Sequence, residues 1–145
     1  MKGYHSMRAQ FYSELPPAAR KIRNLVFVKE QGFKNEFDAV DTDSTHLVIY
    51  NHSTAIATCR FYPDAQQSAV LLGRIAVLPK YRKKHIGAGM LEYAEKQIAT
   101  GPYRKIIIHA QEQASGFYKK CGYTPFGTPD FDEGCPHIWM QKTLV

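Results

Sequence analysis

A basic, glycine-containing segment, YRKKHIGAGML at residues 81–91, is the part of the sequence best suited to binding an anion. Residues 82–84 supply positive charge, and Gly87 and Gly89 allow a ligand or a backbone to come close because they carry no Cβ. The first amides of a helix have no acceptor within the helix, and they attract anions. If a helix begins here, the segment predicts a site for a pyrophosphate.

Two other phosphate motifs do not fit this segment. The dinucleotide fingerprint G-x-G-x-x-G fails because Glu92 stands where the third glycine should be, and the sequence has no Gly-Lys-Ser/Thr of a P-loop. A nucleic-acid site would call for interleaved aromatic residues or a recognised DNA-binding motif, and neither accompanies the basic residues. The remaining structural alternative is a basic loop that only solvates the start of a helix.

The flanking residues predict a strand, a helix and a second strand. AVLLGRIAV at residues 69–77 is nearly all apolar, which predicts a central strand buried on both faces, with Gly73 as a bulge. Apolar residues then recur at helical spacing from Ile86 to Ile98. KIIIHA at residues 105–110 predicts another buried strand. Together these segments predict a right-handed βαβ unit with parallel strands.

The rest of the chain predicts further elements of an α/β fold. They are a helix from the Pro16–Pro17 pair through Val26 and on to VKEQ, a hairpin of strands 45–50 and 54–61, a short helix at 114–120, and final strands at 123–126 and 137–142. We therefore expect a single domain, residues 1–145, with a mixed central sheet flanked by helices on both faces.

Composition restricts the function without identifying it. A net charge of +6 suits an anionic partner, whether nucleic acid, a nucleotide or CoA. The N-terminal residues contain no apolar run typical of a signal peptide, and no segment is apolar for the ~18 residues of a membrane span, so we expect a cytoplasmic protein. Three cysteines without a CxxC pair favour reduced thiols over a disulfide framework or a metal site.

The basic segment and the strand before it resemble a known motif. RIAVLPKYRKKHIGAGML is similar to motif A of the GNAT superfamily of acyl-CoA-dependent N-acetyltransferases, which reads Arg/Gln-x-x-Gly-x-Gly/Ala after a strand. Arg82 and Gly87 fill the outer positions of that pattern. His85 stands where the family usually has glycine, and Lys83 stands where a second glycine is common.

Two further blocks extend the resemblance to nearly the whole chain. QASGFYKKCGY is similar to the family's later motif, with Cys121 and Tyr123 in place of the usual leucine and phenylalanine. The order and spacing of IRNLVFVKEQGF, TCRF, LLGRIAVLPKYR, HAQ and CPHIWM resemble the ElaA/YjcF-like branch.

The resemblance implies transfer of an acetyl group from acetyl-CoA to the primary amine of a small molecule, such as an amine or an amino sugar. It implies that backbone groups of Ile75, Ala76 and Val77 hold the pantetheine arm, with the Val77 amide facing the thioester oxygen. The helix-start residues would cradle the pyrophosphate, namely Arg82, Lys83, Lys84, His85, Ile86, Gly87 and Ala88. Gln111, Phe117 and Tyr118 are further predicted cofactor contacts, and Phe117 is also predicted to belong to the core.

Tyr118 matches the family tyrosine that acts as general acid near the sulfur, because a phenol is protonated at neutral pH and can donate to a thiolate. The alternative is that Tyr118 only packs in the core. The general base is left open among Glu30, Glu36, Asp41, His46, His109 and His137. Glu30 is preferred because the segment that ends the first helix borders the acceptor pocket in the family.

Arg60 and Arg74 lie in otherwise apolar strands, so they need acidic partners, which we expect from the loop at residues 36–43. They would be structural or would bind an anionic group of the acceptor.

Three rival functions remain at this point: a non-catalytic CoA-binding protein, a basic nucleic-acid-binding module, and an enzyme similar to acyl-homoserine-lactone synthases. Those synthases have a similar N-terminal half but are longer and lack the FYKKCGY block. The expected partners are acetyl-CoA and a small amine, without nucleic acid or membrane. Edge strands would also allow a homodimer.

Overall fold

A computed structural model of the protein describes residues 7–145, in which seven strands form a mixed sheet with the hydrogen-bonding order β1-β2-β3-β4-β5-β7-β6. The strands are β1 Met7–Tyr12, β2 Thr45–Asn51, β3 Thr54–Asp64, β4 Ala69–Val77, β5 Lys105–Gln111, β6 Thr124–Asp132 and β7 Cys135–Thr143. The helices are α1 Pro17–Arg23, α2 Ile86–Ile98 and α3 Ser115–Lys120, with a π-helical continuation of α1 at Asn24–Glu30 and short 3₁₀ turns at Ala39–Asp43, Pro79–Tyr81 and Glu112–Ala114. This arrangement confirms the predicted α/β class with a mixed sheet.

The chain divides into two compact units. The first contains residues 7–61 together with Arg74–Ala94, and the second contains Tyr62–Gly73 together with Glu95–Val145. No helix within residues 7–145 is both long and apolar enough to cross a membrane.

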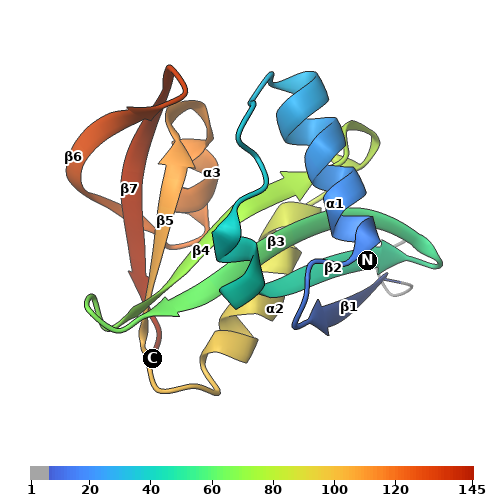
Figure 1. Cartoon of the computed structure of the whole chain (residues 1–145). Coiled ribbons are helices and arrows are strands. Elements are labelled where there is room, and N and C mark those ends of the chain that lie inside the picture. The colour runs from blue at the N-terminus through green and yellow to red at the C-terminus, as the bar shows by residue number, and fades with distance from the viewer. Residues whose placement is uncertain (1–6) are drawn as a thin grey trace. The chain divides into compact units, whose positions relative to one another are not determined.

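In the first unit, β1, β2 and the first part of β3 form an antiparallel sheet, and α1 packs against β2 (Figure 1). Pro16 caps α1 and Pro17 occupies its first turn, where the missing N–H of proline has no helical partner to lose. The helix then widens, because the N–H of Gln31 reaches back five residues to the carbonyl of Val26. A small core of this unit consists of Ile22, Val26, Phe27 and Ala76, with Phe33, Ala55 and Leu78 packed against it.

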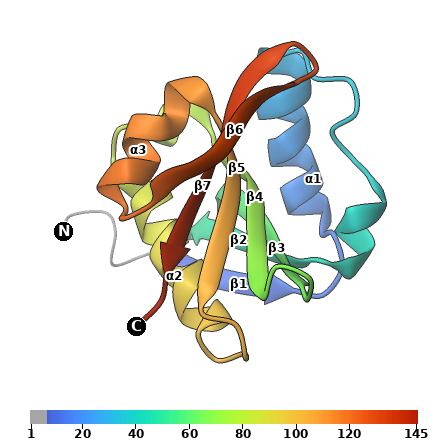
Figure 2. The ribbon, with the colours of Figure 1, turned by 90° about the vertical axis from the view of Figure 1, so that its left-hand side faces the viewer.

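In the second unit, β5 pairs on one side with the first part of β4 and on the other with β7, which forms a long hairpin with β6 (Figure 2). Val70 and Leu71 pair in parallel with Ile106 and Ile107, which confirms the parallel strands predicted for the βαβ unit. The interior of this unit is apolar, since Ile106, Ile107, Ile108, Ala110 and Met140 are all buried.

Two sequence predictions about packing are wrong. Strand β4 is not buried throughout, because three residues in succession, Gly73 to Ile75, are half-exposed. The positive φ in β4 lies on Arg74, at 51°, the residue next to the predicted bulge at Gly73. Phe117 is not a core residue, since 37% of its surface is exposed: it follows Gly116 on the open side of a helix of only six residues.

Candidate functional site

The predicted pyrophosphate segment has the local structure that the sequence indicated. Strand β4 ends at Val77, a short 3₁₀ turn follows, and α2 begins at Ile86. The first helical hydrogen bond of α2 runs from the Gly89 N–H to the His85 carbonyl at 3.1 Å. The amides of the first turn therefore come before the first hydrogen bond of the helix, and the basic loop lies directly before these amides.

Lys83 and His85 both adopt the left-handed backbone region, each with φ 62°. These are the two positions where motif A commonly carries glycine, the residue that reaches this region without steric strain. The loop therefore keeps a glycine-type backbone path with two side chains that do not favour it. His85, the unusual residue of the motif in the sequence, therefore adopts a backbone conformation that strains a residue with a Cβ.

Arg82 connects the end of β4 to the end of the first helical segment. Its Nε donates to the Val77 carbonyl at 2.8 Å, and its two terminal nitrogens donate to the two carboxylate oxygens of Glu30 at 2.7 and 2.8 Å. Arg82, which is predicted to bind the pyrophosphate, and Glu30, the preferred general base, are thus partners of each other. Because a guanidinium has five N–H groups, two remain for a ligand.

The ion pair also changes the chemistry of Glu30. The hydrogen bond from Arg82 holds the pKa of the Glu30 carboxyl below its ordinary value. A carboxylate with a lowered pKa is a weaker proton acceptor. The two side chains are 40% and 37% exposed, so the pair itself contributes little to stability.

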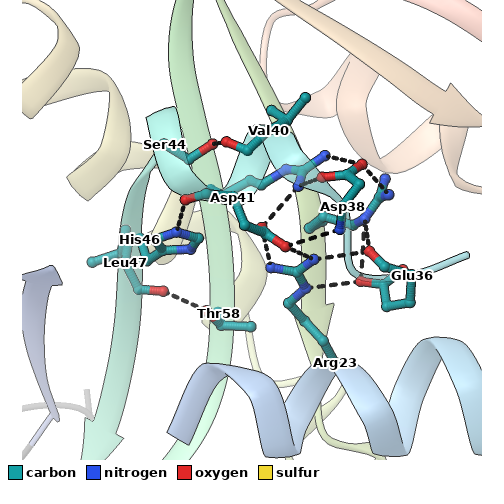
Figure 3. Close-up of polar contacts among 11 residues, drawn as sticks. Arg23, Glu36, Asp38, Val40, Asp41, Ser44, His46, Leu47 and Thr58 are labelled. Carbon is teal, nitrogen blue, oxygen red and sulfur yellow. Dashed lines mark hydrogen bonds and ion pairs between the residues drawn. The ribbon is translucent and has the colours of Figure 1, made fainter. Parts of the chain in front are cut away.

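A buried network of arginines and carboxylates fixes the loop between the first helical segment and β2 (Figure 3). Arg23 projects from α1, donates from Nε to Glu36 at 2.8 Å and from a terminal nitrogen to Asp41 at 2.7 Å. Arg60 donates to Asp38 at 2.7 Å and to Asp41 at 2.8 Å. Arg23 and Asp41 are almost completely removed from solvent, so each needs the charge of the other.

Arg74 completes the network, with its Nε 3.2 Å from Glu36 and a terminal nitrogen 3.3 Å from Asp38. The prediction that Arg60 and Arg74 find acidic partners in the 36–43 loop is confirmed. The sequence reasoning missed Arg23, although its place among the apolar residues of the first helix was a signal of the same kind.

The network also contains three of the residues considered as general bases. Burial raises the pKa of Asp41, but hydrogen bonds from Arg23 and Arg60 outweigh it and bring this pKa down to about 2. Burial raises the pKa of Glu36, and it lowers the pKa of His46, whose Nε2 lies 2.9 Å from the Asp41 carbonyl. Asp41, Glu36 and His46 therefore all take part in the contacts that fix this loop.

In the second unit, Tyr118 of α3 is 7% exposed and contacts Phe117 and Tyr123 edge to face, with ring centroids 5.1 and 6.2 Å apart. The Tyr123 hydroxyl donates to Glu95 at 2.8 Å, and burial raises its pKa above the ordinary range. Tyr123 is therefore a structural phenol that stays protonated, and it packs against the predicted acid.

His109 of β5 lies in a cluster that the sequence did not predict. Its Nε2 is 2.6 Å from Oδ1 of Asp130, and its ring stacks on Trp139 with the centroids 4.1 Å apart. The ring of His137 is 4.6 Å away. The two histidines were considered separately as bases, but nothing in the spacing indicated that they meet or that Asp130 joins them.

Comparison with known proteins decides the family. The acetyltransferase (GNAT) domain matches residues 18–144, nearly the whole chain. The chain belongs to the GNAT family.

The relatives of this GNAT chain include the predicted branch. The uncharacterized N-acetyltransferase YjcF of Bacillus subtilis is 35% identical over 124 residues, which cover 83% of this chain and 87% of YjcF. A solved structure from Lactobacillus plantarum is 31% identical, with a TM-score of 0.88 and coverage of 97% of this chain and 99% of that one. The crystal structure of Escherichia coli ElaA, at 24% identity, shares the fold with a TM-score of 0.82 over 94% of this chain and 99% of ElaA.

Membership of this family establishes an acyl-CoA N-acetyltransferase, and acetyl-CoA is its cosubstrate. The site residues predicted for this GNAT enzyme fall into two groups. Glu30, residues 75–77 and residues 82–88 belong to the first unit, whereas Gln111, Phe117 and Tyr118 belong to the second.

Proposed function

We propose that this GNAT enzyme acetylates the primary amine of a small molecule, an amine or an amino sugar, with Tyr118 as the general acid. The observation that carries the proposal is the loop before α2. Lys83 and His85 hold the left-handed path that glycines usually supply, so a basic loop still leads directly to the start of a helix. Backbone amides and positive charge at that point suit the pyrophosphate of acetyl-CoA.

The remaining roles follow from what the transfer requires. The acceptor must lose a proton, because an ammonium group has no lone pair with which to attack the thioester. The oxyanion of the tetrahedral intermediate needs a hydrogen-bond donor, and we assign this to the amide of Val77. The C–S bond then breaks, and Tyr118 donates its proton to the CoA thiolate.

Glu30 stays a candidate for the proton acceptor, but its bidentate pair with Arg82 makes it a weaker base. A pyrophosphate that engaged Arg82 would compete with this pair.

Two measurements test the proposal. Acetyl-CoA at millimolar concentration is expected to raise Tm clearly, because a ligand that binds only the folded state stabilises it. An amine panel that includes glucosamine, phenethylamine and 1,4-diaminobutane, read by the release of free CoA, is expected to identify an acceptor. No rise in Tm with acetyl-CoA or CoA would refute the proposal.

The role of Tyr118 is tested separately by Tyr118→Phe. The variant keeps the ring and its packing, so it is expected to bind acetyl-CoA as the wild type does while turnover falls about 10²-fold or more. Equal turnover would remove Tyr118 from the acid role.

A further inference from the structure

One face of the second unit's sheet carries polar and aromatic side chains in register across three strands. His109 of β5 lies opposite Trp139 of β7, and His137 of β7 lies opposite Asp130 of β6. Residues opposite one another in a ladder share a face of the sheet. Ile108, the neighbour of His109 in β5, points to the other face and is buried in the core.

The contacts of His109 fix its tautomer. The side chain of Asp130 accepts a hydrogen bond from it, and this bond holds the pKa of Asp130 below its ordinary value. An ionised carboxylate only accepts hydrogen bonds, so the neutral imidazole carries its proton on Nε2 and keeps the lone pair on Nδ1. Stacking on Trp139 at an interplanar angle of 19° fixes the plane of the ring.

The second imidazole of the cluster is oriented in the same manner. His137 Nδ1 lies 2.8 Å from the Cys135 carbonyl, so it donates there and keeps its lone pair on Nε2. His137 is only 5% exposed, whereas the His109 side chain is 29% exposed. A molecule from solvent can therefore reach His109.

Stability does not explain this arrangement. The Asp130 side chain is 46% exposed, and an ion pair or hydrogen bond open to solvent contributes little to folding. What the contacts provide is an accessible imidazole with one fixed tautomer and one fixed ring plane. That is the arrangement a proton acceptor needs.

We propose that His109 takes the proton from the ammonium group of the acceptor, and that Asp130 is its positioning residue. The inference rests on the proposed acetylation of an amine. Strand β5 pairs in parallel with the first part of β4, and His109 lies two residues beyond the pair of Leu71 with Ile107.

The protons balance across the reaction. Nδ1 of neutral His109 accepts one proton from the ammonium group, which leaves the amine with its lone pair. The amine nitrogen then forms a bond to the thioester carbon, and the C–S bond breaks. The CoA thiolate receives the phenol proton of Tyr118. The nitrogen loses its second proton, and this proton restores the phenol of Tyr118. One proton passes from His109 to solvent in each turnover, and the products are the amide and free CoA.

His109→Gln tests the proposal with the amine on which the wild type releases CoA. At pH 7 we expect kcat/KM to fall about 10²–10⁴-fold, the usual contribution of a general base, with acetyl-CoA affinity unchanged. The loss should shrink as the pH approaches about 10, where an alkylamine supplies its own lone pair. His109→Ala should regain activity when imidazole is added to the buffer, which a purely structural role would not allow.

Two further variants complete the test. Asp130→Asn should lower kcat/KM less than His109→Gln and displace the acid limb of its pH profile, because the imidazole loses its charged partner. His52→Asn is the matched control: His52 is exposed in the turn between β2 and β3 with φ 56°, a region that asparagine tolerates, and activity should be unchanged.

The outcomes separate this inference from the proposed function. A folded His109→Gln variant with wild-type kcat/KM at pH 7 overturns the inference and leaves amine acetylation intact. A loss that is the same at every pH and is not rescued by imidazole also overturns it. A wild-type protein whose Tm does not respond to acetyl-CoA overturns both.

Discussion

Replacing Lys83 with glycine should stabilise the protein, although it removes a side chain and a charge. Lys83 has φ 62°, in the left-handed region that costs a residue with a Cβ about 1–2 kcal/mol. Glycine relieves this strain but has more freedom in the unfolded chain, which offsets about 0.4–1 kcal/mol. The expected net gain in the free energy of unfolding is about 0.5–1 kcal/mol, or a rise in Tm of about 2–3 °C for a chain of this size.

Lys84→Gly is the matched control, because it removes the same side chain and charge from the next position of the same loop. Lys84 lies between the two left-handed residues and is not itself left-handed, so glycine there only adds freedom to the unfolded state. Its ammonium group also lies 6.0 Å from the centre of the Tyr81 ring, and the loss of that weak contact acts in the same direction. We expect Lys84→Gly to be about 0.5–1 kcal/mol less stable than the wild type.

Urea unfolding at fixed ionic strength measures both variants. The difference between them, about 1–2 kcal/mol, reports the strain at Lys83 because the lost charge is common to both. If Lys83→Gly proves no more stable than Lys84→Gly, the left-handed conformation is not strained, and the account of this loop is wrong.

Three other predictions concern stability and ligand binding. Asp41→Asn should lower the free energy of unfolding at pH 7 by about 2–3 kcal/mol, since the native pKa lies at about 2 against an ordinary 3.8. A native pKa below the unfolded one stabilises the fold above about pH 4 and ceases to do so as the pH falls through about 2, so urea midpoints of variant and wild type should converge over that range. Glu30→Gln should change Tm little but tighten acetyl-CoA binding several-fold in calorimetry, because Arg82 loses a competing anion; weaker binding would mean that Glu30 instead orients Arg82 for the phosphate. Gly89→Ala should raise Tm, since an added Cβ meets no atom within 4 Å and alanine favours a helix by up to about 1 kcal/mol, whereas a lower Tm would contradict this.

Elements with a strong period or a clear boundary could be predicted from the sequence. The bounds of α2 and β4 were predicted to the residue, because an apolar stripe or a continuous apolar run fixed each of them. Strand β1 was missed, and β6 extends six residues beyond the predicted end at Phe126. Neither strand contains a buried residue, so β-pairing with a partner strand, and not their own hydrophobic pattern, makes them strands.

The candidate site shows the same division. Local sequence placed a basic loop and a helix start in the right order, and it indicated that Arg60 and Arg74 need carboxylates. The sequence could not show that Arg82 pairs with Glu30, because the two residues are 52 positions apart. Either charged side chain could also be solvated by water without a partner.

The sequence by itself determined what each residue can do chemically and where the chain turns from strand to helix. It carried enough ordered motifs to indicate the GNAT family before any contact was known. Tertiary structure alone decided which charges neutralise one another and which imidazole is held ready for a proton. Hydrophobic periodicity is a property of neighbouring residues, but the register that brings His109 of β5 onto Trp139 of β7 and to Asp130 of β6 exists only when three separate strands have paired.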